Sequence, residues 1–94
     1  MEKLSEEALA KAVERLEGWS LQAGELVREF KFADFVGAMA FVNRVATEAE
    51  AAGHHPDIDV RYNRVRLGLV THDSGGITEK DVEMAGRLNG VSIQ

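Results

Sequence analysis

The sequence predicts an α+β fold of two layers, in which a four-stranded antiparallel sheet carries three helices on one face. Two pairs of short segments alternate apolar and polar residues around tight turns, which is typical of β-hairpins. Three further stretches place apolar residues at helical spacing, before, between and after the hairpins. The predicted order of elements is therefore α-β-β-α-β-β-α.

The composition indicates a small globular protein. The 94 residues are 45% hydrophobic and 29% charged, and no repeat or linker divides them. We therefore expect a single domain spanning residues 1–94. A core of this size leaves little stability to spare, so self-association would be a natural way to bury more apolar surface.

Several classes of site and partner are disfavoured by what the chain lacks. It has no cysteine, which excludes disulfides and thiolate metal sites and fits a reducing compartment, so we expect a cytoplasmic location. Residues 1–13 alternate charged residues with alanine and leucine, unlike a signal peptide or a membrane-spanning helix. The formal net charge of -5 disfavours nucleic-acid binding, which relies on Lys and Arg. We expect neither a nucleic-acid nor a membrane partner.

The first and last helices are delimited by residues that favour helix ends. Ser5 can cap the first helix and Gly18 ends it. Thr78 with Asp81 resembles a capping box and starts the last helix. The apolar positions are Leu9, Ala12, Val13 and Leu16 in the first helix and Val82, Ala85 and Leu88 in the last.

The first hairpin is expected directly after the first helix. A half-buried strand leads to a turn at Gly24, and residues 26–32 return as the second strand. Phe30 and Phe32 fall on the same face of this returning strand. The apolar residues that alternate along the first strand are Trp19, Leu21 and Ala23.

The longest helix is expected to run to about residue 52. Asp34 is a good N-cap, and Gly53 supplies the C-terminal stop. The stripe that this helix should bury consists of Phe35, Met39, Val42, Val45, Ala46 and Ala49.

The second hairpin is expected to turn at residues 63–64, because Asn tolerates a positive φ. This register places Tyr62 opposite Val65. Farther along the ladder it places His55 opposite His72, with Cβ atoms roughly 5 Å apart. The intervening pairs are Val60 with Leu67 and Ile58 with Leu69.

All three histidines, His54, His55 and His72, gather at one end of this hairpin. Active sites collect titratable groups, and imidazole suits general acid–base work. Glu50, one helical turn before His54, would orient or charge it. Zinc binding is an alternative, although adjacent histidines are awkward joint ligands unless the chain bends at Pro56. Because no strong nucleophile is evident, the residues favour proton transfer, as in an elimination or a hydration.

A specific run of residues surrounds the histidines: Glu50-Ala-Ala-Gly-His54-His55-Pro56, then Tyr62-Asn63, Thr71-His72 and Asp81. Upstream, Gly18-Trp19, residues 28–32, Asp34-Phe35 and residues 41–46 extend the pattern. Over nearly its whole length the chain resembles the pterin-4a-carbinolamine dehydratase family. It departs from animal members at Gly53, where an acidic residue often stands, and at Ile58, which replaces an aromatic residue.

The resemblance implies a 4a-hydroxytetrahydrobiopterin dehydratase without metal or cofactor. Such an enzyme removes water from 4a-hydroxytetrahydropterin to give quinonoid dihydropterin during tetrahydropterin recycling. The resemblance also implies a homodimer or homotetramer that takes a pterin as its small-molecule substrate.

The resemblance assigns His54 and His72 as the acid–base pair, with His55 binding and orienting the pterin. Glu50 and Thr71 are further substrate-binding candidates. Trp19 is a third, although a buried core anchor explains that residue at least as well.

A non-enzymatic binding module is the alternative, because members of this family also stabilise the dimer of a transcription factor. The exposed side of the long helix would then be the contact surface for the protein partner. In that case loss of the histidines would leave the function intact, and charged substitutions on the helix would abolish it. A third class, assembly helpers that keep the fold but lose the enzyme, would be expected to lack one of the histidines. This chain retains all three, which favours catalysis.

Overall fold

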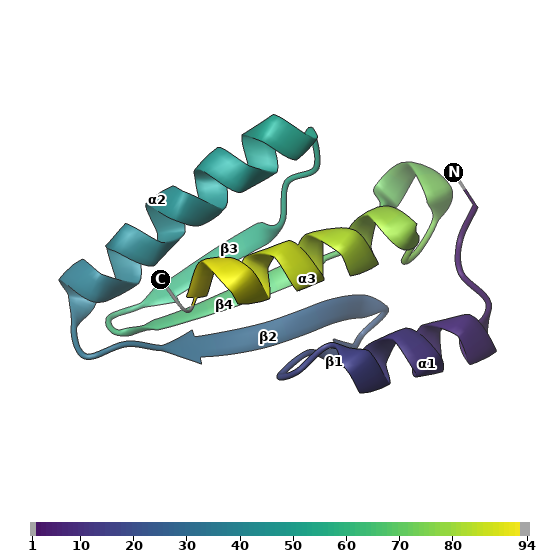
Figure 1. Cartoon of the computed structure of the whole chain (residues 1–94), viewed down its shortest axis with the longest axis horizontal. Helices are drawn as coiled ribbons and strands as arrows, with labels where there is room; N and C mark the ends of the chain where they lie inside the picture. The colour runs from purple at the N-terminus through teal and green to yellow at the C-terminus, as the bar shows by residue number, and fades with distance from the viewer. Residues whose placement is uncertain (1, 93–94) are drawn as a thin grey trace.

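The helices and strands follow the order that the sequence predicts (Figure 1). The computed structural model describes residues 2–92. Residues 1, 93 and 94, which the expected domain also included, lie outside the described part. No helix within residues 2–92 is long and apolar enough to cross a membrane. The elements are α1 (Glu6–Arg15), β1 (Ser20–Gln22), β2 (Glu25–Lys31), α2 (Phe35–Ala52), β3 (Asp57–Arg61), β4 (Arg64–Leu69), a short 3-10 helix η1 (His72–Ser74) and α3 (Glu79–Ser92).

The four strands form one antiparallel sheet in the order β1-β2-β4-β3, so β2 and β4 are central. Alternate residues of the central strands are buried on the face that the helices cover, among them Phe30 and Leu67. The opposite face carries exposed charged residues such as Glu29 and Arg66. In Figure 1, α2 and α3 lie over the sheet and α1 lies beside β1. The predicted two-layer α+β arrangement is confirmed.

Side chains cap the helices where the sequence predicts. The Ser5 hydroxyl accepts a hydrogen bond from the Ala8 N–H at 3.1 Å, and the Asp34 carboxylate accepts one from the Gly37 N–H at 2.8 Å. Gly53 ends α2 in the left-handed conformation, with φ of 65°. These caps fix the residues at which α1 and α2 begin and the residue at which α2 ends.

The first strand is shorter than predicted. Ala23 and Gly24 both have positive φ and form a two-residue turn, so Ala23 is not part of the strand. Leu21 is 46% exposed, because it lies on an edge strand of three residues. Of the three residues predicted to alternate into the core, only Trp19, just before the strand, is buried.

The predicted register of the second hairpin was wrong by two residues. Arg61 pairs with Arg64, so the turn consists of Tyr62 and Asn63. Asn63 is held in place by Phe32: its carbonyl accepts from the Phe32 N–H at 2.8 Å, and its side-chain amide donates to the Phe32 carbonyl at 2.9 Å. A two-residue shift keeps every side chain on its predicted face. However, the correct pairs are Val60 with Val65 and Ile58 with Leu67, so His55 does not lie opposite His72.

The buried stripe of α2 also differs from the prediction. Phe35 is 49% exposed and Ala46 is exposed, and the row that faces the core is Ala38, Phe41, Val45 and Ala49. Two neighbouring rows of α2 are apolar, so helical spacing alone could not choose between them. Aromatic packing decides the orientation: the Phe41 ring centroid lies 4.7 Å from that of Phe30 and 5.0 Å from that of Phe32.

A polar clasp joins α3 to the segment between α1 and β1. The Asn89 side-chain oxygen accepts hydrogen bonds from the Trp19 indole N–H at 2.7 Å and from Arg28 Nη1 at 2.6 Å. The Asn89 amide donates to the Glu17 carbonyl at 3.1 Å, and Arg28 donates to that same carbonyl at 2.8 Å. The clasp therefore satisfies the polar atom of a buried tryptophan.

Replacing Asn89 with alanine should destabilise the fold, because the indole N–H of Trp19 would lose its acceptor. A buried donor without a partner costs about 1–3 kcal/mol. We expect Asn89→Ala to lower the urea midpoint accordingly with an unchanged m-value. Asn43→Ala, at an exposed position of α2, is the matched control and should change stability by less than about 0.5 kcal/mol. Equal midpoints for the two variants would contradict this role of the clasp.

Candidate active site

The end of α2 places two adjacent histidines in different environments. Gly53 turns the chain, with hydrogen bonds from its N–H to the carbonyls of Ala49 and Glu50. The His54 N–H also returns to the Ala49 carbonyl at 3.1 Å. After this turn the His54 side chain is only 13% exposed, whereas that of His55 is 63% exposed. The buried Pro56 then leads into β3.

His54 is held by a buried carboxylate. Its Nε2 lies 2.5 Å from Oδ1 of Asp81, whose side chain is fully buried. We assign the hydrogen of this pair to Nε2, because an ionised carboxylate only accepts hydrogen bonds. This assignment leaves Nδ1 for proton exchange. The same logic orients the histidine of a Ser-His-Asp triad.

Asp81 is itself fixed by the start of α3 and the end of the sheet. Its Oδ2 accepts from the Thr78 N–H at 2.9 Å and from the Thr71 hydroxyl at 2.7 Å. The Thr78 hydroxyl lies 2.9 Å from the Thr71 hydroxyl and accepts from the Lys80 N–H at 3.2 Å. The predicted capping box is therefore present, and its carboxylate also holds His54.

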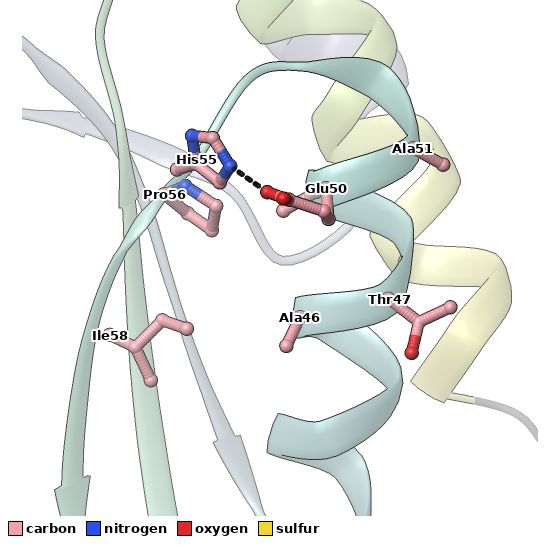
Figure 2. Close-up of a pocket in the computed structure, with 8 residues that line it drawn as sticks. Ala46, Thr47, Glu50, Ala51, His55, Pro56 and Ile58 are labelled. Atoms are coloured by element: carbon pink, nitrogen blue, oxygen red, sulfur yellow. Dashed lines mark hydrogen bonds and ion pairs between the residues drawn. The ribbon is translucent and has the colours of Figure 1, made fainter.

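Glu50 contacts His55 rather than His54, which corrects the expectation from helical spacing. Its Oε1 lies 2.7 Å from His55 Nε2 (Figure 2). The Gly53 turn redirects the chain, so the i, i+4 geometry of a continuing helix does not apply to residue 54. The Glu50 side chain is 81% exposed, and an exposed pair of this kind contributes little stability.

His72 comes from the loop between β4 and α3. A bridge between Thr71 and Gly76 closes this loop, and Gly75 supplies a left-handed turn within it. The His72 imidazole is exposed and has no hydrogen-bond partner among residues 2–92. It is therefore free to meet a ligand.

All three histidines line one cavity of about 310 Å³, although the strand pairing that led to this expectation was wrong. The end of α2, the end of β4 and the start of α3 bring them together. Thr71 also lines this histidine cavity, and Glu50 reaches it only through His55. The lining residues are Gly53, His54, His55, Val70, Thr71, His72, Asp73 and Lys80.

Trp19 does not line the histidine cavity. It is buried in the core, and its ring lies edge-on to Phe30 with centroids 6.2 Å apart. The sequence did not predict that Asp81 contributes to the site by contacting His54. The sequence identified Asp81 as a capping residue, but only the folded chain shows that it contacts His54, which lies 27 positions away.

The cavity is suited to moving protons. It holds one imidazole braced by a carboxylate and two exposed imidazoles, with the ammonium-bearing Lys80 at its wall. Within residues 2–92 no three His, Cys, Asp or Glu side chains are arranged to hold a metal ion. Two imidazoles facing one small cavity can act as acid and base on opposite sides of a bound molecule.

The chain is similar to known proteins over nearly its whole length. The family model described as pterin 4 alpha carbinolamine dehydratase matches residues 2–91. A protein of Acidobacterium capsulatum, provisionally named a pterin-4-alpha-carbinolamine dehydratase, is 57% identical over 94% of this chain and 96% of its own length. A protein of Chloroflexus aurantiacus with the same provisional name is 55% identical over 95% of this chain and 96% of its own.

Two solved structures share the fold. A transcriptional coactivator/pterin dehydratase from Brucella melitensis superposes with a TM-score of 0.91 at 37% identity, over 96% of this chain and 98% of that one. A pterin dehydratase-like RuBisCO assembly factor of the alpha-carboxysome gives 0.64 at 23% identity over 79% of this chain, which supports the fold alone. With its family model matched across residues 2–91 and relatives more than half identical, this chain belongs to the pterin 4 alpha carbinolamine dehydratase family.

Proposed function

We propose that this protein dehydrates 4a-hydroxytetrahydropterin to quinonoid dihydropterin. The observation that carries the proposal is the cavity shared by His54, His55 and His72, in which His54 is braced by the buried Asp81. Membership in the family supplies the substrate class. We propose that the reaction serves the recycling of tetrahydropterin and that it takes place in the cytoplasm.

The reaction needs two proton transfers. The bond between C4a and its hydroxyl oxygen breaks, and the leaving oxygen takes a proton from an acid to depart as water. A base removes a proton from a ring nitrogen, whose electron pair completes the new double bond to C4a. Positioned general acids and bases each contribute roughly 10²–10⁴-fold to such a reaction.

We assign His54 and His72 to these two transfers. Both line the histidine cavity: His54 is held by Asp81 through Nε2, and His72 comes from the loop between β4 and α3 without a hydrogen-bond partner among residues 2–92. Either histidine can act as the acid, with the other as the base. The proposal includes no metal ion and no cofactor.

His55 is proposed to bind and orient the pterin, with Glu50 behind it as its hydrogen-bond partner. Thr71 lines the cavity, but its hydroxyl donates to Asp81, so its contribution would come partly through that carboxylate. Trp19 lies in the core and is left out of the proposed site.

A second candidate function is a binding module that stabilises a protein partner through α2. Phe35 and Val36 favour it, because their side chains are 49% and 74% exposed at the start of that helix. The same surface would equally serve the proposed homodimer or homotetramer. This candidate leaves the histidine cavity without a role, which is why we place it second.

The two proposed acid–base histidines can be tested directly by kinetics. His54→Ala and His72→Ala should each lower kcat by roughly 10²–10⁴-fold, because each removes a proton-transfer group. Dehydration of enzymically generated 4a-hydroxytetrahydropterin is followed by ultraviolet absorbance, with and without a chelator.

The control for these variants is Asn43→Ala, at an exposed position outside the cavity. Acceleration by wild type that the control retains and both histidine variants lose would establish the acid–base pair. A folded wild-type protein that gives no acceleration would contradict the proposal and favour the binding module. Loss of activity on chelation would contradict the absence of a metal.

Asp81 should act as a positioning residue, and Asp81→Asn tests it. An asparagine amide cannot accept all the hydrogen bonds that the carboxylate receives, so one donor from His54, Thr71 or Thr78 would face another donor. We expect kcat to fall by roughly 10-fold or more, with little change in KM.

Thr78→Val is the matched structural control for this variant. It removes a hydroxyl from the same network but leaves the contact between His54 and Asp81. Both variants should lose stability, of the order of 1 kcal/mol or more, but only Asp81→Asn should lose kcat. Equal losses of kcat in the two would show that Asp81 has only a structural role.

The role of His55 predicts a different kinetic pattern. Its exposed ring contributes binding rather than proton transfer, so His55→Ala should raise KM more than it lowers kcat. Steady-state measurements with the same substrate check this. The reverse pattern, a large fall in kcat at constant KM, would overturn the assignment.

A further inference from the structure

An apolar groove lies between α2 and the edge strand β3, next to the histidine cavity (Figure 2). Its volume is about 680 Å³, roughly twice that of the histidine cavity. Ala46 and Glu50 from α2 face Pro56 and Ile58 across it, and His55 stands at its upper end in Figure 2. We call it the α2–β3 groove.

His55 joins the two spaces. It lines both the α2–β3 groove and the histidine cavity, so a molecule bound against one side of its ring can extend to the other. The turn at Gly53 and the buried Pro56 hold this residue between them. The groove therefore adjoins the proposed site, with His55 between the two.

The lining of the groove selects for apolar, uncharged groups. Ala46, Pro56 and the 39% exposed Ile58 present carbon atoms to it. Among residues 2–92, Glu50 is the one charged residue in its lining apart from the titratable His55, and its carboxylate would repel a negatively charged group. The hydrogen bond between Glu50 Oε1 and His55 Nε2 pairs two of the polar atoms at that end.

The chemistry of the substrate indicates what occupies the groove. In 4a-hydroxytetrahydropterin, the reacting C4a is bonded to N5, and N5 is bonded to C6. When C4a faces His54 and His72, a substituent on C6 therefore leaves the cavity beside the reacting edge of the ring. We propose that the α2–β3 groove is a subsite for an uncharged, mainly apolar substituent at C6 of the pterin. This inference rests on the proposed dehydration and adds to it a preference among pterins.

The experiment compares 4a-hydroxytetrahydropterins with hydrogen, methyl or propyl at C6. For wild type, we expect kcat/KM to increase by roughly threefold to fourfold with each additional carbon of the C6 substituent that is buried in the groove. Ala46→Leu fills the groove, and we expect it to lower the ratio of kcat/KM for the propyl over the unsubstituted substrate by about tenfold. Ala40→Leu, exposed on α2 outside the groove, is the matched control and should keep the wild-type ratio.

Binding of the corresponding stable 7,8-dihydropterins, measured by calorimetry, supplies a readout that needs no turnover. The same preference for propyl in wild type, lost in Ala46→Leu, would support the subsite. If wild type dehydrates all three pterins equally, or if both leucine variants keep the ratio, the subsite is overturned and the dehydratase stands. If wild type neither binds nor dehydrates any of them, both proposals fail. If Ala46→Leu changes the sedimentation of the protein but not the ratio, the groove is a contact between copies and the inference is wrong.

Discussion

The buried carboxylate of Asp81 is the group on which the site depends. It accepts hydrogen bonds from the start of α3 through Thr78, from the end of the sheet through Thr71, and from the end of α2 through His54. A buried charge is tolerated only when it is fully hydrogen-bonded, so these three segments must meet in one arrangement. The histidine cavity lies where they meet, and its geometry is therefore tied to the packing of the fold.

Features that depend on neighbouring residues were predictable from the sequence. The caps at Ser5 and Asp34 and the turn at Gly53 act over a few residues, and each is present. The antiparallel hairpins and the order of elements followed from alternation and helical spacing, which are also local. The capping box at Thr78 and Asp81 was predicted for the same reason.

Features that depend on distant residues were not predictable. The turn of the second hairpin is set by Asn63 bonding to Phe32, which lies 31 positions away, so the register assumed from the hairpin alone was wrong. The buried row of α2 is set by Phe41 packing against aromatic rings of β2 and the residue after it. The partner of His54 was equally hidden, since spacing along α2 indicated Glu50. The histidines nevertheless converge, because the end of α2, the end of β4 and the start of α3 meet at one cavity.

The most direct test of the account is to locate pterin binding by nuclear magnetic resonance. Imidazole, indole and backbone amide nitrogen signals of the protein would be followed while a stable 7,8-dihydropterin is added. The account predicts that the signals of His54, His55 and His72 shift, that His54 keeps its hydrogen on Nε2 facing Asp81, and that the Trp19 indole signal stays in place. Shifts confined to Trp19 or to α2 residues near Phe35, with the imidazole signals unchanged, would contradict it.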